Sequence, residues 1–149
     1  MHINYESIKP VAPNKLIKWA EKNPKKLILI DGIGAILSAF FLGIILVHWQ
    51  RFFGIPVASL YFLAGFPILF AVFDLYSLFQ KNQNFASYLK LIGLLNLSYC
   101  ALSISAGIFH RHEITSLGWS YLLFEVSVII ILALWELKIS GNLKLKSKA

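Results

Sequence analysis

The sequence predicts an all-α integral membrane protein, a four-transmembrane-helix up-down bundle with a short N-terminal interfacial helix. Three observations lead to this fold class. The 149 residues are 58% hydrophobic and only 14% charged, whereas soluble domains carry about 25% charged residues. Four apolar runs reach the length of a membrane-spanning helix, and the connections between them are short. This composition argues against soluble, disordered and disulfide-rich classes of protein.

A helix before the first span is predicted from residues 15–23. Asn14 is a suitable N-cap for it, and Pro24 would end it. Leu16, Ile17 and Ala20 fall on one side of this helix and its lysines fall on the other, which is typical of a helix lying in the membrane interface. The alternative is a disordered basic tail. In either case residues 1–26 form a basic N-terminus, residues 27–137 the bundle, and residues 138–149 a basic tail.

Each apolar run is long enough to cross the hydrocarbon layer as a helix. The runs cover residues 27–47, 57–79, 91–109 and 117–135, and each holds at most one acidic residue and no lysine or arginine. A helix needs roughly 20 residues to cross a bilayer core about 30 Å thick. A β-barrel would need many alternating segments of roughly ten residues, which this sequence lacks. Connections of 9, 11 and 7 residues make consecutive helices antiparallel.

The first two spans each carry one acidic residue near the same end of the bundle. Asp31 lies four residues inside the first span, and Asp74 lies five residues before the end of the second. In the first span Asp31 shares a helix face with Gly34, Ala35 and Ser38, and a second, small-residue face holds Gly32, Ala39 and Gly43. Pro67 removes one backbone hydrogen bond from the second span, which either kinks the helix or opens a cavity beside Asp74.

The last two spans carry stripes of small and polar residues. The third has Asn96, Tyr99, Cys100, Ser103 and Gly107, and the fourth has Gly118, Tyr121, Glu125, Leu132 and Glu136. Glu125 lies near the middle of the membrane, at a depth similar to that of Tyr99, so we expect a hydrogen bond between these two side chains. Lys90 is expected within reach of Asp74 or Asp31.

Five residues are therefore candidates for binding a ligand or a proton: Asp31, Asp74, Asn96, Tyr99 and Glu125. Charged groups inside the bilayer are costly and face protein or water. One interpretation is a half-channel in which Asp31 and Asp74 form the entry and Glu125 exchanges a proton for a cation. The other is that the polar groups only hold the helices together by hydrogen bonds.

The positive charge is distributed very unevenly. The N-terminus, the connection 80–90 and the tail carry all 12 lysines, whereas the other two connections hold Arg51 and Arg111. Cytoplasmic loops carry the excess of basic residues, so both termini are expected in the cytoplasm. The net charge of +7 favours contact with membrane lipids, and nucleic-acid binding is not expected.

The opposite end carries weak metal-binding candidates: His48, His110, His112 and Glu113. Imidazole and carboxylate groups suit divalent metals, but the spacing matches no standard motif, so neither a metal nor another cofactor is expected. Cys100 is the only cysteine, which excludes an internal disulfide. No nucleophile–base pair, phosphate-binding loop or HExxH motif is present, so we predict no catalytic residues and do not expect an enzyme.

Several segments resemble an uncharacterised family of small four-transmembrane-helix bacterial membrane proteins. They are DGIGA at 31–35, FGIP at 53–56 with LYFL at 60–63, NLSYC at 96–100, and LGWSY at 117–121 leading to Glu125. The resemblance covers residues 27–137. It implies a bacterial inner-membrane location and a four-helix fold, and it brings no activity or site residue with it.

Two functions follow as expectations. The first is a polytopic inner-membrane protein without a catalytic site, acting as a structural or accessory subunit, with a homo-oligomer or another membrane protein as partner. The alternative is a small proton-coupled transporter or binding protein for a lipophilic molecule that uses Glu125 and Asp74.

Overall fold

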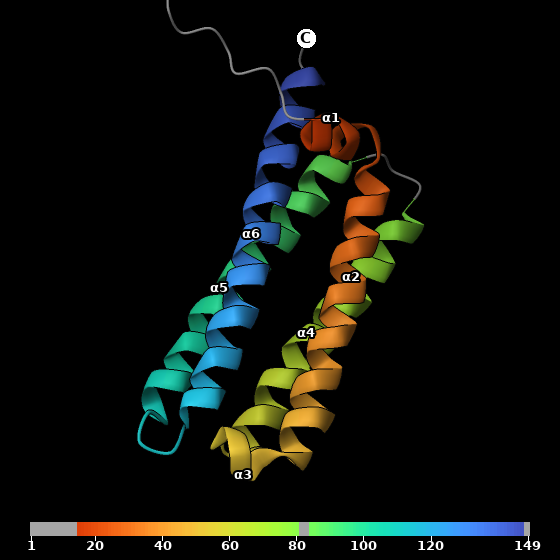
Figure 1. The fold of residues 1–149 in the computed structure, drawn as a ribbon. Coiled ribbons are helices and arrows are strands. Elements are labelled where there is room, and N and C mark those ends of the chain that lie inside the picture. The colour runs from red at the N-terminus through yellow and green to blue at the C-terminus, as the bar shows by residue number, and fades with distance from the viewer. Residues whose placement is uncertain (1–14, 81–83, 148–149) are drawn as a thin grey trace, which may run out of the picture.

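The protein is a bundle of helices in the computed structural model, which describes residues 15–80 and 84–147. Its elements, shown in Figure 1, are α1 (Lys15–Lys22), α2 (Pro24–Phe40) with a π-helical continuation η1 (Phe41–Leu46), α3 (Gln50–Phe53), α4 (Val57–Phe79), α5 (Phe85–Phe109) and α6 (Ser116–Lys146). Four are long and apolar enough to cross a membrane: α2 with η1, α4, α5 and α6. The predicted fold class is confirmed.

The helices extend beyond three of the four predicted spans. The second span agrees with α4, but α2 begins at Pro24, α5 begins at Phe85 and α6 continues to Lys146. Pro24 starts α2 rather than only ending α1, because the first helical turn needs no backbone N–H donor. Beyond residue 135, α6 still buries Ile139 and Ser140, so tertiary packing continues the helix where hydrophobicity falls.

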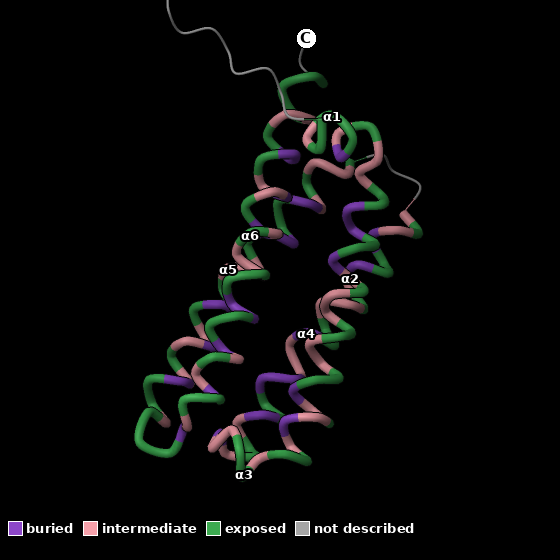
Figure 2. Tube along the Cα trace, in the orientation of Figure 1, coloured by how far each residue is buried: buried purple, intermediate pink, exposed green. Residues whose placement is uncertain are grey.

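The four long helices pair as two helical hairpins, α2 with α4 and α5 with α6 (Figure 1). Small residues allow close approach within each pair. A Cβ added at Gly43 would lie 3.5 Å from Ala64 Cβ, and one at Gly93 would lie 3.0 Å from the Ala133 carbonyl oxygen. The small-residue face predicted on the first span is thus turned toward α4. Figure 2 shows the buried positions on the facing sides of the helices and exposed positions outside.

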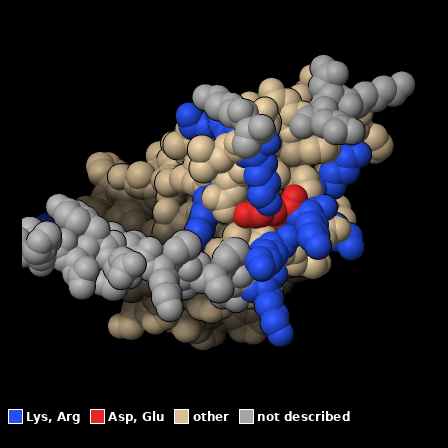
Figure 3. Space-filling model, turned by 90° about the horizontal axis from the view of Figure 1, so that it is seen from above, with Lys and Arg blue, Asp and Glu red and all other residues tan. Residues whose placement is uncertain are grey.

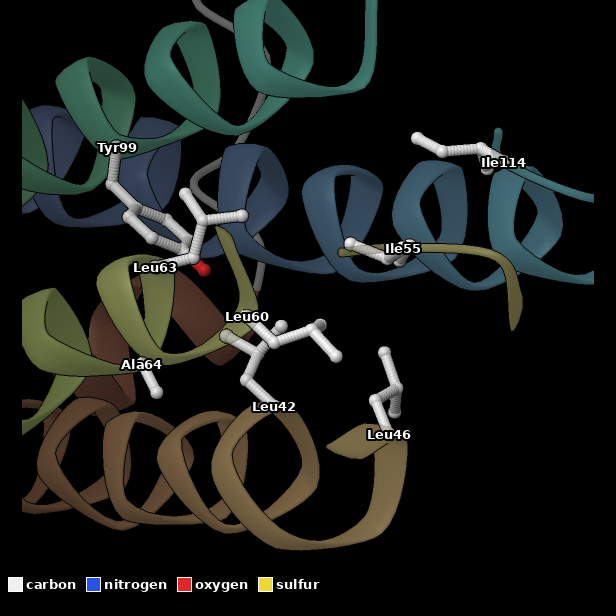
Figure 4. Packing of buried hydrophobic residues seen from close by; sticks show 8 residues of the cluster. All are labelled: Leu42, Leu46, Ile55, Leu60, Leu63, Ala64, Tyr99 and Ile114. Atoms are coloured by element: carbon white, nitrogen blue, oxygen red, sulfur yellow. The ribbon is translucent and has the colours of Figure 1, made fainter. Parts of the chain in front are cut away.

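The two hairpins are joined at the end of the bundle that carries α3. Thr115 donates its backbone N–H to the Phe53 carbonyl at 3.1 Å and its hydroxyl to the Phe52 carbonyl at 2.6 Å. Gly54 makes this contact possible, because its φ of +69° is a conformation that favours glycine. A hydrophobic cluster, drawn in Figure 4, fills the same half of the bundle: Leu42, Leu46, Ile55, Leu60, Leu63, Ala64, Tyr99 and Ile114.

At the opposite end, which we call the terminal end, α1 lies across the ends of α2 and α6 (Figure 1). Ala20 is fully buried and Ile17 packs beside it, whereas Leu16 is exposed. The predicted helix therefore forms over Lys15–Lys22, but only part of its apolar side contacts the protein. Its predicted N-cap, Asn14, lies outside the described residues.

Lysine side chains gather at the terminal end, where Figure 3 shows them around a small acidic patch. Those within the described residues are Lys15, Lys18, Lys22, Lys25, Lys26, Lys90, Lys138, Lys144 and Lys146. Glu21 of α1 lies among them and accepts hydrogen bonds from Asn142 at 2.6 Å and from Lys146. This ion pair ties α1 to the end of α6.

Acid is expected to release α1 from α6. The hydrogen bond from Lys146 lowers the pKa of Glu21 below its usual 4.5. A lowered pKa stabilises the docked state above pH 4.5, and this contribution is lost as the pH falls through the folded-state value. An exposed ion pair contributes at most about 1 kcal/mol, so the undocked fraction should rise about fivefold.

A spin label on α1 measures this release. The label is attached through Leu16→Cys in a Cys100→Ala background, and its mobility is followed against pH. Glu21→Gln should raise the mobility at neutral pH and abolish the dependence on acid. An equal response to acid with and without Glu21 would show that the ion pair does not hold α1.

Candidate functional site

A cavity of about 400 Å³ lies between the two hairpins and is lined by all four long helices. Beside this space the two hairpins meet where Tyr99 of α5 packs against Phe66 and Phe70 of α4. The lining residues are Asp31, Gly34, Ala35, Leu37, Ser38, Phe41, Pro67, Asn96, Tyr99, Tyr121, Phe124, Glu125, Val128, Ile129 and Leu132. Aliphatic and aromatic walls with a few polar groups are typical of sites for small molecules.

The cavity is bordered by residues that also face the outside of the bundle. Four residues that line the cavity are also between 43% and 71% exposed. They are Leu37 of α2, Phe41 of η1, and Phe124 and Val128 of α6. The outer surface of a membrane-spanning bundle faces lipid. The opening therefore lies between α2 and α6, at the level of the hydrocarbon chains.

A cluster of three acids and one amide borders the end of the cavity nearer the termini, where Asp31 and Asn96 line it. Asn96 donates its Nδ2 protons to Asp31 Oδ1 at 2.9 Å and to Glu136 Oε2 at 3.4 Å. The Asp74 carboxyl faces Asp31 from α4. Gly32 of α2 lies against Asp74, since a Cβ added at Gly32 would lie 3.3 Å from the Asp74 Cβ. We call Asp31, Asp74, Asn96 and Glu136 the acidic cluster, and each of them is less than 10% exposed.

The acidic cluster has more acceptors than donors. Asp31 Oδ2, both Asp74 oxygens and Glu136 Oε1 have no hydrogen-bond partner among the described protein atoms. The ion pairs found in the described chain are His110 with Glu113 and Lys146 with Glu21, so Lys90 does not reach Asp74 or Asp31 as predicted; it is exposed. Carboxyls so close together titrate as one group, which suits the cluster to share protons.

Glu125 and Tyr99 line the same cavity without bonding to each other. Tyr99 Oη and Glu125 Oε1 are both buried and unpartnered within the described part of the structure, so the predicted hydrogen bond between them is wrong. Tyr99 instead packs between Phe66 and Phe70 of α4, with ring centroids 6.3 Å and 6.1 Å away. The polar neighbours of Glu125 in the cavity are Ser38 and Tyr121.

The histidines and Glu113 do not assemble into one site. His110 Nδ1 lies 3.4 Å from Glu113 Oε1, His112 accepts from Arg111 at 3.2 Å, and His48 packs on Trp49. No group of three or more His, Cys, Asp or Glu side chains in residues 15–80 and 84–147 is placed to hold a metal ion. Cys100 is buried between α5 and α6, where its thiol points to the Val126 carbonyl at 3.8 Å.

No protein-family model, curated protein or solved structure matches this chain. The resemblance of residues 27–137 to a bacterial membrane-protein family therefore identifies no family. The candidate site is supported by its geometry alone. It is a lipid-facing cavity with Asp31 of the acidic cluster toward the termini and Glu125 nearer the middle of the bundle.

Glu136 is a site residue that the candidate set omits. The predicted fourth span ended at residue 135, one residue before Glu136, whereas α6 continues to Lys146 and fully buries this side chain. The sequence does place it on the same stripe as Glu125, because 11 residues make three helical turns and return to the same face.

Pro67 was predicted to disturb the second span, which is α4 in the structure. It lies buried inside the continuous helix α4 and lines the large cavity. Without an N–H group, proline cannot bond to the Leu63 carbonyl. The helix is continuous through this proline, and Asp74 is not among the residues that line the cavity beside it.

Proposed function

We propose that the protein binds a lipophilic cation, such as a protonated amine, in the large cavity and exchanges it for a proton at Glu125. The observation that carries this proposal is the composition of the cavity wall. The wall holds the carboxyls of Asp31 and Glu125 but no lysine or arginine. A buried carboxylate needs a proton or a cation as its partner.

The aromatic residues of the wall support a cationic ligand. Phe41, Tyr99, Tyr121 and Phe124 contribute rings to it. A cation over an aromatic face gains about 2 kcal/mol or more when it is desolvated. Rings and carboxylates together select a ligand that is both apolar and positively charged.

The opening between α2 and α6 supports entry from the bilayer. A lipophilic amine partitions into the membrane, so its concentration beside this opening exceeds that in water. Glu125 then binds the charged group of the ligand. The acidic cluster supplies a second group of carboxyls nearer the termini, where Asp31 lines the cavity and Asp74 lies behind it. Proton exchange at these carboxyls is the basis of the coupled transport that we propose.

A purely structural role explains the polar residues less well. Residues that hold helices together do so by hydrogen bonds. Asn96 serves in this way, but Asp74, Tyr99 and Glu125 each leave buried oxygen atoms without a partner among the described residues. An accessory or homo-oligomeric role would still be compatible with ligand binding, since the proposed site lies within one chain.

The location that we propose is a bacterial inner membrane with both termini in the cytoplasm. The support is the contrast between the nine described lysines of the terminal end and Arg51 and Arg111 at the other. Anionic lipid headgroups around the lysines are the proposed lipid partners.

Binding of 1-aminoadamantane, compared with its neutral analogue 1-adamantanol, tests the proposed function. Calorimetry on the protein in nanodiscs should show that Glu125→Gln weakens binding of the amine about thirtyfold or more, because losing one partner of a buried charge pair costs about 2–5 kcal/mol. Affinity for the alcohol should stay unchanged. Acid should weaken amine binding, since protons compete for the same carboxylate.

Glu113→Gln is the matched control, because Glu113 is an exposed carboxyl outside the cavity. It should leave the affinity for the amine unchanged. Equal amine affinities of the original protein and Glu125→Gln would contradict the proposed function.

A further inference from the structure

A second, smaller cavity connects Glu125 with the α3 end of the bundle. Its volume is about 10 Å³, and its polar lining consists of Ser59, Ser103, His110, Tyr121 and Glu125. The rest of the lining is apolar, and a cavity of this size is just large enough for one water molecule, for which these polar groups would be the partners. Glu125 and Tyr121 therefore border both cavities, and Glu125 lies between them.

A polar connection leads from this cavity to the surface. Ser59 Oγ lies 3.0 Å from His110 Nε2, and the other ring nitrogen of His110 lies 3.4 Å from Glu113 Oε1. The Glu113 side chain is 63% exposed, whereas that of His110 is 21% exposed. One ring nitrogen of His110 thus lies near the exposed Glu113, and the other lies near the Ser59 hydroxyl, which lines the cavity.

Unpartnered polar atoms face the same cavity from inside. Ser103 Oγ and Glu125 Oε1 are buried and have no hydrogen-bond partner among the described atoms. Ser103 and Gly107 lie one turn apart on α5, His110 is the C-cap of this helix, and all three line the cavity. Buried polar atoms normally have partners, and a water in this cavity would satisfy both Ser103 and Glu125.

We propose that His110, Ser59 and Ser103 form a proton pathway from the α3 end to Glu125. This inference rests on the proposed function, because it assigns the route by which the exchanged proton reaches Glu125. A proton taken up at His110 Nδ1 is matched by release of the Nε2 proton to Ser59. The Ser59 hydroxyl proton passes through water beside Ser103 to the Glu125 carboxylate, so one proton moves and Ser59 regains its hydroxyl. His110 is left with its proton on Nδ1 and returns to the Nε2–H tautomer before the next transfer.

The groups that surround the two ends of this pathway are compatible with proton transfer. Glu125 is faced by Tyr99 and Cys100 of α5 and by Tyr121 of its own helix, and α2 contributes only the hydroxyl of Ser38. His110 is faced by Glu113, with Arg111 and His112 next to it in the chain. The ion-pair partner of His110 is thus the exposed Glu113, 3.4 Å from its outer nitrogen.

Infrared spectroscopy after a pH jump tests the pathway on the full-length protein in nanodiscs. The carboxyl band of Glu125 is assigned by its disappearance in Glu125→Gln, and its appearance after acidification gives the rate of protonation. Ser59→Ala and His110→Leu should each slow this rate tenfold or more. Ser59→Ala deletes a single oxygen atom. If His110→Leu does not fold, the Ser59→Ala variant still tests the pathway.

His112→Leu and Ser98→Ala are the matched controls. His112 is exposed beside His110, and Ser98 is exposed and bonds only to the Leu94 carbonyl of its own helix. Both should leave the rate unchanged. An unchanged rate in Ser59→Ala, or the absence of a Glu125 band that responds to pH, would overturn the pathway.

The same variants separate this inference from the proposed function. At a fixed neutral pH, Ser59→Ala should bind 1-aminoadamantane as the original protein does, because Ser59 does not line the large cavity. Slowed protonation in a protein that never binds the amine would support the pathway and contradict the proposed ligand.

Discussion

Alanine in place of Gly118 is expected to destabilise the bundle by about 3 kcal/mol or more. A Cβ at this position would lie 2.1 Å from the Phe53 carbonyl oxygen and 2.7 Å from Ile114 Cγ2. The carbonyl belongs to the backbone that Thr115 holds by a hydrogen bond, so it cannot move without separating the two hairpins at the α3 end. Overpacking of this kind costs about 1–3 kcal/mol, and more where backbone must shift.

Thermal unfolding in detergent measures the loss, with Cys100 as the reporter. Cys100 is the only cysteine and is buried, so a thiol-reactive fluorophore labels it when α5 and α6 separate. Gly65→Ala is the control, because a Cβ there meets nothing within 4 Å, and alanine should stabilise the helix by about 1 kcal/mol. Similar melting temperatures for the two variants would contradict a tight contact at Gly118.

Leucine in place of Asn96 is expected to cost about 3 kcal/mol and to uncouple the acidic cluster. Asn96 is the donor that joins Asp31 of α2 to Glu136 of α6. Leucine preserves much of the volume but leaves both carboxyls without a donor. Each buried acceptor left unsatisfied costs about 1–3 kcal/mol.

A double-mutant cycle with Glu136→Gln checks the reason for this loss. Glutamine supplies its own N–H donors, so it should offset part of the damage, and the two substitutions should be coupled by about 1 kcal/mol or more. Ser98→Ala, on the exposed side of the same helix, should melt like the original protein. Strict additivity would show that Asn96 and Glu136 do not act as one unit.

Hydrophobicity alone predicts some helix ends but not others. The second span agrees with α4 because apolar residues end where the helix ends. In α6, Lys138 is exposed while Ile139 and Ser140 are buried, so an amphipathic segment extends the helix. A window that averages hydrophobicity cannot detect this extension, and for that reason the predicted span ended at residue 135, just before Glu136.

The structure brings three of the five candidate residues into direct proximity and leaves one predicted contact unmade. Asp31, Asp74 and Asn96 do meet in one cluster, as their common depth suggested. Tyr99 and Glu125 share a cavity but make no hydrogen bond, because Tyr99 packs between two phenylalanine rings of α4. Depth along a helix follows from residue number, whereas the direction of a side chain depends on how its helix is rotated and on what its neighbours leave open.

The sequence by itself determined the four spans, their antiparallel order and the level at which each buried acid lies, because all three depend on local composition and on the fixed rise of a helix. Only the tertiary structure decided that the helices pair as two hairpins, that their ends meet through Thr115 and Glu21, and that a cavity remains between them. Helix pairing depends on shape complementarity between residues far apart in the chain, such as Gly118 against Phe53 and Gly32 against Asp74. No local pattern encodes that fit, and it is the fit that creates the space for a ligand beside Glu125.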